Sequence, residues 1–396
     1  MTKIDDKRVP ALRFKGFNDD WAQRKLGDIA NVDSSKRIHR SEYTKEGIPF
    51  FRGSEITDRK ISNLIYISKK KYNEIKNQYG VPKPGDLLIT AVGTIGNIWK
   101  VDNTSFYYKD GNLIHINPKC IDEDYLVYYF QFLKYKKIID RVASGSNQKA
   151  LTIIKVQNLK IKYPQKEGQS LIGVLLKKTE NLIALQQRKL QQLKLLKKAM
   201  LQDLFTDKNV PKLRFNGFDA NWIQCKLGKE TLLTMGQSPS GSTYSDQPST
   251  YILVQGNADL KNGWVKPRIW TTQITKLAKK GDIIITVRAP AGKVGRTNFD
   301  VVLGRGVASI HGNDFIFYLL SKMDMNKYWK KYAAGSTFES INSDDIKNTR
   351  VHVPNLSEQN RIANLFLRLD DLIRFQQNEL KYLQKIKKFL LQNMFI

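Results

Sequence analysis

Cysteine is scarce in this sequence. Its 396 residues include only Cys120 and Cys225, which lie far apart and form no Cys-x-x-Cys spacing. This scarcity argues against a disulfide framework and a structural zinc site, and it is typical of proteins in a reducing cytosol. No apolar stretch approaches the ~18 residues of a membrane span, and the charged residues 1–8 contain no apolar signal core. We therefore expect a cytoplasmic protein without a membrane partner.

Acidic residues are also few relative to basic ones. There are 37 Asp and Glu residues against 66 Lys and Arg, which gives a formal net charge of +29. A basic excess of this size favours a polyanionic partner, most often nucleic acid. A membrane-surface binder and a basic protein without such a partner are the alternatives. The hydrophobic content of 41% is ordinary for a globular protein, and the length suggests two or three domains.

The motifs that mark common catalytic sites are missing. There is no GxxxxGK[ST] phosphate loop, since Gly292-Lys293 is followed by Val294, and no GxGxxG loop joins a strand to a helix. The acidic motif with paired prolines of adenine methyltransferases is absent as well. The consecutive acids 122–124 fit a helix start better than a nuclease metal site, and the four histidines show no metal-ligand spacing. The sequence thus predicts no catalytic residue and no metal or cofactor bound by this chain.

What the sequence does contain is an internal duplication. Residues 9–30 return as residues 210–231, and the strand-like segment 85–90 (GDLLIT) returns as 281–286 (GDIIIT). Ala143-Ser144-Gly145-Ser146 returns 190 residues later, and this offset then holds to the last residues. The first pair of segments shares Val9, Pro10, Leu12, Arg13, Phe14, Gly16, Phe17, Trp21, Gln23, Lys25, Leu26 and Gly27.

The middle segments of the two halves, 31–142 and 232–332, hardly resemble each other. A shared frame that carries two unlike inserts indicates one task performed on two different targets. The alternative is an old duplication whose halves have drifted, which explains the repeat but not the preserved frame.

Residues 169–205 and 359–395 lack proline and are rich in Leu, Lys and Gln, which predicts two helices of about 55 Å each. Apolar positions recur near every seventh residue, and each seam also contains a Gln and, further along, a Lys (Lys197 and Lys387). Polar seam residues specify register and pairing, so we expect an antiparallel coiled coil. The alternative is that each helix packs separately on its own domain. The predicted seam is Ile183, Gln186, Leu190, Leu193, Ile373, Gln376, Leu380 and Leu383.

The inserts read as mixed α/β (α+β) structure. Leu87–Thr90 and Ile283–Thr286 are predicted strands that follow a Gly-Asp turn and lead into glycine-containing loops. Further strands are expected at Pro49–Phe51 and Tyr251–Val254, and short amphipathic helices at Tyr125–Tyr135 and Phe315–Met323.

Together these features resemble the specificity subunit of type I restriction-modification enzymes, over nearly the whole chain. The resemblance rests on the Leu-Arg-Phe…Trp…Leu-Gly opening motif and its copy, the Gly-Asp strand-loop-Gly elements, the Gly-Ser segments and the two Gln-rich helices. It implies an internal pseudo-two-fold repeat of two target recognition domains, separated by two long antiparallel coiled-coil helices. The expected division is 1–162 for the first recognition domain, 163–205 for the central helix, 206–352 for the second domain, and 353–396 for a C-terminal helix that packs on the central one.

The resemblance also implies the partners. Each recognition domain would read one half of a split, asymmetric site in double-stranded DNA, and the helices would set the spacer. Two modification subunits would bring S-adenosylmethionine and methylate adenine, and two restriction subunits would add ATP- and magnesium-dependent translocation and cleavage. An RNA-binding or coiled-coil adaptor protein and a divergent stand-alone DNA methyltransferase are the alternatives that the unlike inserts argue against.

Candidate DNA contacts are polar or cationic residues on the glycine-containing loops, where a backbone can approach a ligand closely. The second half is shorter between matched motifs, so contacts cannot be transferred from one half to the other. Trp21 and Trp222 belong to the repeated frame and are expected in the core, as are the tyrosines at 107, 108, 128 and 129. The candidates are Arg52, Ser54, Thr94, Ser146, Asn147, Lys149, Gln255, Asn257, Arg288, Arg305, Ser336 and Thr337.

Overall fold

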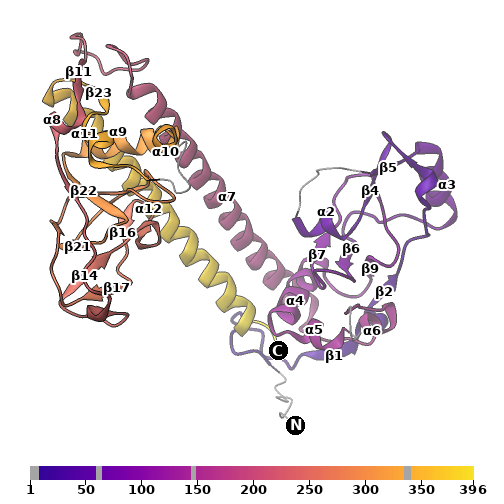
Figure 1. The fold of residues 1–396 in the computed structure, drawn as a ribbon. Helices are drawn as coiled ribbons and strands as arrows, with labels where there is room; N and C mark the ends of the chain where they lie inside the picture. The colour runs from indigo at the N-terminus through magenta and orange to yellow at the C-terminus, as the bar shows by residue number, and fades with distance from the viewer. Residues whose placement is uncertain (1–8, 59–64, 144–148, 334–339) are drawn as a thin grey trace. The chain divides into compact units, whose positions relative to one another are not determined.

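The computed structural model describes residues 9–58, 65–143, 149–333 and 340–396. The chain forms two compact units: Met1–Gln187 with Asn378–Ile396, and Arg188–Gln377. Each unit contains a mixed α/β domain, as predicted, and about half of each of the two long helices (Figure 1). Within the described residues, no helix is both long and apolar enough to cross a membrane.

The domain of the first unit is built on two four-stranded sheets. Their strand orders are β2-β9-β6-β7, which is antiparallel throughout, and β3-β5-β4-β8, in which β4 and β8 are parallel. The strand bounds are β2 Ala30–Asp33, β3 Tyr43–Thr44, β4 Ile48–Phe51, β5 Ile65–Ile67, β6 Leu87–Thr90, β7 Ile98–Lys100, β8 Tyr107–Tyr108 and β9 Leu113–Pro118. The helices are α1 Leu26–Ile29, α2 Gly53–Asp58, α3 Lys69–Gln78, α4 Glu123–Tyr135, α5 Ile138–Val142 and α6 Ile153–Gln157, with a short 3-10 turn η1 at Arg40–Glu42.

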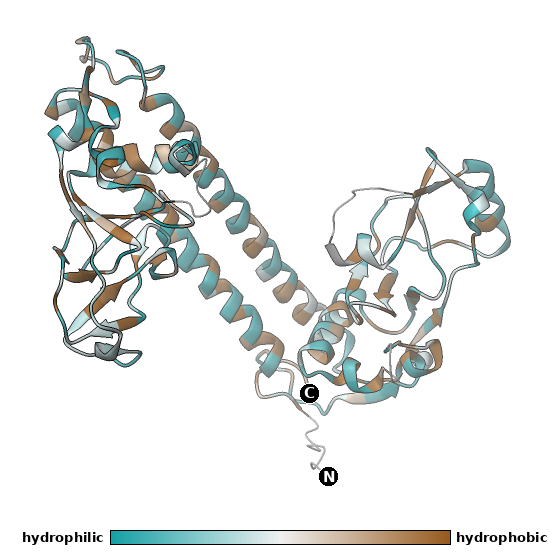
Figure 2. Cartoon of the chain, in the orientation of Figure 1, coloured by the Kyte–Doolittle hydropathy of each residue, from teal (hydrophilic) through white to brown (hydrophobic). Residues whose placement is uncertain are grey.

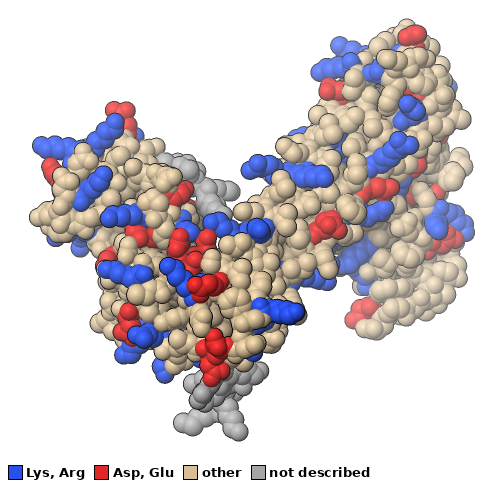
Figure 3. All heavy atoms as spheres, turned by 180° about the vertical axis from the view of Figure 1, so that it is seen from behind, with Lys and Arg blue, Asp and Glu red and all other residues tan. Residues whose placement is uncertain are grey.

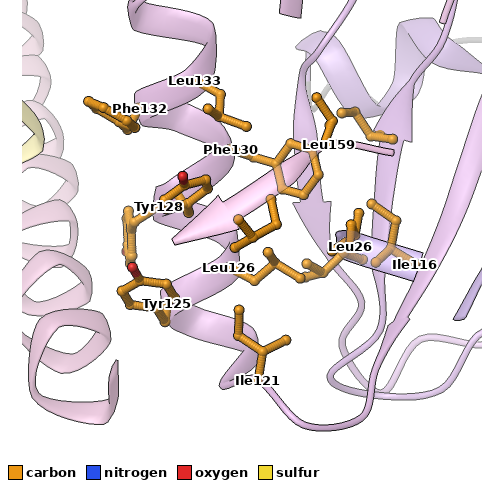
Figure 4. Close-up of a cluster of buried hydrophobic side chains, with 14 of the residues drawn as sticks. Leu26, Ile116, Ile121, Tyr125, Leu126, Tyr128, Phe130, Phe132, Leu133 and Leu159 are labelled. Atoms are coloured by element: carbon orange, nitrogen blue, oxygen red, sulfur yellow. The ribbon is translucent and has the colours of Figure 1, made fainter. Parts of the chain in front are cut away.

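The core of this unit lies on both sides of α4. Figure 4 shows Leu126 and Phe130 on the side that faces the sheet, and Tyr128 and Phe132 on the opposite side. Because both sides are buried, α4 lies between the sheet and the long helices of the same unit. The predicted core tyrosines are all buried, namely Tyr107, Tyr108, Tyr128 and Tyr129.

The domain of the second unit repeats this plan with larger sheets. A six-stranded sheet has the order β12-β22-β19-β20-β16-β15, and a five-stranded sheet has the order β13-β17-β14-β21-β18. The strand bounds are β12 Leu232–Met235, β13 Tyr244–Ser245, β14 Tyr251–Val254, β15 Leu260–Lys261, β16 Trp264–Val265, β17 Ile269–Thr271, β18 Leu277–Ala278, β19 Ile283–Thr286, β20 Val294–Arg296, β21 Val301–Leu303 and β22 Val307–His311. The helices are α8 Leu227–Glu230, α9 Asp314–Met325, α10 Lys330–Ala333 and α11 Ser343–Lys347, with 3-10 turns η2 Gly241–Thr243 and η3 Asn257–Asp259.

The repeated opening motif forms the same local structure twice. In the first unit β1 (Ala22–Lys25) pairs antiparallel with β10 (Lys160–Tyr163), and in the second β11 (Ile223–Lys226) pairs antiparallel with β23 (Arg350–Val353). Trp21 and Trp222 immediately precede β1 and β11 and are both buried, which confirms the prediction that they belong to the core.

Repeated polar residues connect each domain helix to a long helix. Asp122 and Asn313 cap α4 and α9 by accepting a backbone hydrogen bond from the third residue of the first turn. Gln169 accepts from the backbone N–H of Asp122 at 2.9 Å, and Gln359 accepts from the Asn313 side chain at 2.8 Å. Both glutamines also donate to the carbonyl of the proline five residues earlier. These contacts explain why the glutamine and the proline recur at the same offset.

The long helices are α7 (Lys166–Leu204) and α12 (Leu356–Asn393), and each begins three residues earlier than the sequence pattern suggests. Brown and teal alternate along both helices in Figure 2, as expected for helices with one apolar side. All eight predicted seam residues are buried or half-buried, whereas residues between them, such as Leu185 and Phe375, are exposed.

The pairing of α7 with α12 is antiparallel within each unit. In the first unit Glu180 of α7 forms an ion pair with Lys387 near the end of α12. In the second unit Lys197 near the end of α7 forms an ion pair with Asp370 in the first half of α12. The antiparallel pairing explains why the compact units divide in the middle of the long helices, whereas the expected division ran between the central helix (163–205) and the second domain (206–352).

Candidate nucleic-acid interface

The Gly-Asp turn before β6 and before β19 is stabilised by the aspartate. In the first unit Asp86 accepts hydrogen bonds from the backbone N–H of Lys83 at 2.8 Å, from His115 Nε2 at 2.8 Å and from Asn117 at 2.7 Å. In the second unit Asp282 accepts from the backbone N–H of Lys279 at 2.9 Å and lies 2.8 Å from His311 Nδ1. The aspartate therefore positions the strand that leads to the candidate loop.

The two histidines lie in different electrostatic surroundings. His115 is held between Asp86 and Asp33, with Nδ1 2.9 Å from Asp33 Oδ1, and it lines a cavity of about 480 Å³ with Tyr107. Burial alone would lower the pKa of His115, but the hydrogen bonds to Asp33 and Asp86 raise it to about 9. In the second unit the strand register places Ser309, opposite Thr234, at the position of His115, and His311 at the position of Asn117, so a histidine held between two carboxylates is not repeated there. The cavity lies at the opposite end of β6 from the candidate loop.

A threonine at the end of β6 and β19 anchors the loop that follows. Thr90 Oγ1 donates to the carbonyl of Thr94 at 2.5 Å and accepts from the backbone N–H of Asn97 at 2.9 Å. Thr286 Oγ1 likewise donates to the carbonyl of Pro290 at 2.7 Å and accepts from the backbone N–H of Lys293 at 2.9 Å. Both loops are thus fixed in the same way, although their exposed side chains differ.

Three segments converge at this loop in the first unit. The backbone N–H of Leu151 donates to the carbonyl of Ala91 at 2.8 Å, and an isolated bridge joins Val92 to Ala150. A Cβ on Gly53 would lie 3.8 Å from the methyl group of Thr90, so the segment after β4 adjoins the same strand end.

The second unit brings the corresponding segments together. The backbone N–H of Val287 donates to the carbonyl of Gly306 at 2.9 Å, and that of Ile341 donates to the carbonyl of Val287 at 2.9 Å. Gly306 packs so closely on Gln255 that a Cβ would overlap the Gln255 carbonyl oxygen. The segments 255–257, 288–292 and 304–306 therefore form one surface.

Of the candidates in the first unit, Thr94 and Lys149 are exposed and lie on neighbouring segments. Arg52 is in a different position, because its Nη2 lies 2.6 Å from Glu55 Oε1 and its own backbone N–H donates to Glu55 Oε2 at 2.7 Å. Burial alone would raise the pKa of Glu55, but its hydrogen bonds with Arg52 lower it. Ser54 donates to the same carboxylate at 3.0 Å. Ser146 and Asn147 lie outside the described residues.

In the second unit Gln255, Asn257, Arg288 and Arg305 lie on the converging segments, and the last three are exposed. A carboxylate again organises the turn, since Asp259 accepts from the backbone N–H of Gln255 at 2.7 Å. Arg288 is joined to Ser340 by an isolated β-bridge, and the Arg305 backbone N–H donates to Ser238 Oγ at 3.0 Å. Ser336 and Thr337 lie outside the described residues.

The sequence reasoning missed a cation-aromatic cluster beside the second loop. Lys331 Nζ lies 3.8 Å from the ring centroid of Tyr328 and 4.9 Å from that of Tyr332. Burial alone would raise the pKa of Tyr328, but its hydrogen bond with Lys331 lowers it. The signal in the sequence is the alternation of Lys and aromatic residues at 327–332, which is a common pattern in nucleic-acid-binding segments.

Gly292 fixes the position of the second loop against Trp329. A Cβ at Gly292 would overlap Cδ1 of Trp329, and the residue also has a φ of +86°. We expect Gly292→Ala to lower the free energy of unfolding by about 2–4 kcal/mol, through left-handed strain and overpacking together, and to weaken DNA binding.

The matched control for this change is Gly281→Ala. Gly281 has a φ of +95° but nothing within 4 Å of the added Cβ, so only the strain of about 1–2 kcal/mol is expected. Thermal unfolding of both variants measures the difference. Equal losses in the two variants would show that Trp329 does not hold the loop.

The basic residues are not confined to these loops. On the face seen in Figure 3, Lys and Arg side chains are spread over both units with Asp and Glu among them. The distributed positive charge therefore favours attraction to any polyanion, whereas the side chains on the loops are what differ between the two units.

The family model of the type I restriction modification DNA specificity domain matches residues 18–195 and 234–385, which together are most of the chain. This chain belongs to the type I restriction-modification specificity family. Each matched segment contains one variable domain and much of one long helix, as the resemblance of the sequence implied.

A curated relative agrees with membership of the specificity family, and solved structures share the fold. A putative type I restriction enzyme MjaX specificity subunit of Methanocaldococcus jannaschii is 30% identical, with 93% of this chain and 91% of the relative covered. The MjaVIII specificity subunit of the same organism is 22% identical over the same shares. The crystal structure of a type I restriction-modification S subunit from M. genitalium has the same fold, with a TM-score of 0.65 at 14% identity and coverage of 98% and 99%. A chain from a structural study of the assembly of a type I R-M system has a TM-score of 0.58 at 21% identity, with coverage of 94% and 96%.

Proposed function

We propose that this chain reads the two unlike halves of a bipartite, asymmetric site in double-stranded DNA, one half with each unit. The observation that carries the proposal is the repeated loop frame. Thr90 and Thr286 anchor their loops with the same hydrogen bonds, but the loops present Val92-Gly93-Thr94 in one unit and Arg288-Ala289-Pro290 in the other. Two loops with the same backbone anchoring and different side chains are what recognition of two different DNA sequences requires.

Contacts of two kinds are expected at each half-site. Lys and Arg residues would bind phosphates and provide most of the affinity, and polar side chains on the loops would bind base edges in the major groove. Since phosphate neutralisation releases counterions, binding should weaken steeply as the salt concentration rises.

The long helices offer surfaces for two modification subunits. Leu182 and Leu185 on α7 are about half exposed, and so are Leu372 and Phe375, which occupy the equivalent positions on α12. Exposed apolar pairs beside a buried seam are typical of protein interfaces. Because the exposed pairs recur with the repeat, the chain would have two equivalent docking sites. The helices between the recognition domains would set the length of the DNA spacer.

This chain would recognise the DNA site and carry out no reaction itself. The chemistry, with S-adenosylmethionine for methylation and ATP and magnesium for translocation and cleavage, belongs to two modification and two restriction subunits. The whole assembly would act in the cytoplasm on double-stranded DNA, and this chain would bind no cofactor itself.

Mapping adenine methylation in a cell that contains the modification partner, with and without this gene, tests the proposal. We expect one bipartite asymmetric motif to lose its methylation when the gene is removed. If no motif changes while the partner is expressed and active, the proposal is wrong. Equal affinity of the purified chain for duplexes of any sequence would instead favour an adaptor protein.

Replacing Arg288 should affect one half-site only. An arginine on a loop commonly binds a guanine through two hydrogen bonds, which contribute about 1–3 kcal/mol of discrimination. We therefore expect Arg288→Ala to relax the sequence requirement at one position of one half-site, by about 5- to 150-fold.

The control for Arg288→Ala is Lys280→Ala, an exposed cation before the other end of the same strand, β19. This change should leave the methylated motif unaltered. Relaxation in both half-sites after Arg288→Ala, or in neither, would argue against a base contact by this residue.

A further inference from the structure

A lysine, a carboxylate and a tyrosine join three helices in the first unit. Lys387 Nζ of α12 lies 3.1 Å from Glu180 Oε1 of α7, and the Tyr128 hydroxyl of α4 donates to Glu180 Oε2 at 2.9 Å. The lysine also lies over the Tyr128 ring, 5.8 Å from its centroid. The Lys387 side chain is only 19% exposed, so the cluster is part of the packed seam rather than the outer surface.

The second unit contains the same cluster built from the opposite copies. Lys197 of α7 forms an ion pair with Asp370 of α12, and the Tyr318 hydroxyl of α9 donates to Asp370 Oδ2 at 2.8 Å. Lys197 lies 5.2 Å from the centroid of the Tyr318 ring, and its side chain is 24% exposed. Residues 128, 180 and 197 correspond to 318, 370 and 387 in the repeat, so the two clusters are equivalent.

Net stability does not explain such a cluster well. A charge pair taken out of water loses hydration, and well-packed apolar residues of similar size often stabilise a fold equally or better. What the pair provides is selection of one register, because a shift by one helical turn of about 5.4 Å would leave both charges unpaired in a half-buried seam. The tyrosine extends this selection to the domain helix, since its hydroxyl shares the carboxylate.

We propose that these two clusters, Lys387–Glu180–Tyr128 and Lys197–Asp370–Tyr318, fix the register of α7 on α12 and the seat of each recognition domain on that helix pair. They would thereby restrict the chain to one spacer length between the half-sites. The inference rests on the proposed function and adds to it the residues that determine the spacing.

The test replaces both lysines with methionine, which keeps their length and removes the charge. Lys197→Met with Lys387→Met is produced in the full chain together with its modification partner, and the methylated motifs are mapped. We expect both half-site sequences to be unchanged, methylation at other spacer lengths to rise about tenfold, and thermal stability to fall, because Glu180 and Asp370 lose their partner cations.

Two further variants complete the experiment. The matched control, Lys198→Met with Lys381→Met, alters exposed lysines of the same two helices and should leave a single spacer length. Exchange of the charges in one cluster, Lys387→Glu with Glu180→Lys, should largely preserve the single spacer even if the methionine variant folds poorly.

Several outcomes would overturn the inference. One is an unchanged spacer distribution in the folded methionine variant. A second is complete loss of methylation with normal folding, which would place the lysines in partner docking. Failure of the charge exchange to keep the spacer when the methionine variant does not fold would count equally against it. If the unaltered chain directs no bipartite methylation at all, the proposed function fails, and that result is distinct from these.

Discussion

Replacing Arg214 with methionine is expected to destabilise the second unit by about 3–5 kcal/mol. Arg214 binds Glu358 through two hydrogen bonds of 2.8 Å, and the Glu358 side chain is completely buried. Trp222 Nε1 donates to the same carboxylate at 3.3 Å. Without the guanidinium, the glutamate would remain buried with only this neutral partner and its charge uncompensated, which is far more costly than the loss of an exposed ion pair.

Arg13 provides the control within the same chain. It occupies the equivalent place in the first opening motif, but the residue equivalent to Glu358 is Gly168, and Nη1 of Arg13 is buried without a hydrogen-bond partner. Arg13→Met leaves no buried carboxylate without a partner, so it should lower the free energy of unfolding by about 1 kcal/mol or less. Urea unfolding measures the losses, and hydrogen exchange assigns them to a unit.

A second change distinguishes loss of the ion pair from loss of packing. Arg214→Met combined with Glu358→Leu removes the stranded charge and should recover most of the stability. Equal losses for Arg13→Met and Arg214→Met, or no recovery in the double variant, would contradict the assignment of the effect to Glu358.

The second large effect is a loss of stability of the first unit at alkaline pH. The pKa of His115 is raised to about 9 by Asp33 and Asp86, against about 6.5 in an unfolded chain. Between these pH values the folded state binds more protons than the unfolded state, so the free energy of unfolding falls as the pH rises. The contribution, about 3 kcal/mol, is fully present below pH ~6.5 and is lost as the pH passes ~9.

Asp86 makes a contribution to stability that is lost at acidic pH. Burial alone would raise its pKa, but the hydrogen bonds from His115 and from the backbone of Lys83 lower it, so its contribution is lost only as the pH falls through that lowered pKa. Chemical unfolding between pH 6 and 10 tests the alkaline effect. His115→Gln should flatten the slope, and His311→Gln, a histidine substitution in the second unit, is the control that should not alter the loss in the first unit. A slope that survives His115→Gln would disprove the assignment.

The sequence pattern predicted the repeated frame because the frame is locally encoded. Strand 283–286 and strand 251–254 have the predicted bounds, and the buried tryptophans follow from a motif that returns intact. Alternation of apolar residues and a Gly-Asp turn act over a few residues, so they can be read without the tertiary structure.

The candidate loops were predicted less completely. The carboxylate of Glu55 binds Arg52, yet nothing in the Arg-Gly-Ser-Glu sequence separates a base reader from an arginine that is neutralised by its neighbour. The Lys331 cluster depends on how α10 folds back beside Gly292. Such contacts arise between segments far apart in the chain or from one side-chain rotamer, and neither is visible in a pattern.

By itself the sequence determined that the chain is a basic, duplicated protein with two unlike α/β inserts and two long helices. These properties depend on composition and on short periodicities, which every local segment expresses. Only the tertiary structure decided that each unit combines half of both helices, that the half-buried lysine of one helix meets the carboxylate of the other, and that Glu358 is paired while Gly168 leaves Arg13 without a carboxylate. The reason is that antiparallel packing joins residues about 170 to 210 positions apart, and the free energy of those contacts depends on burial that exists only in the folded chain.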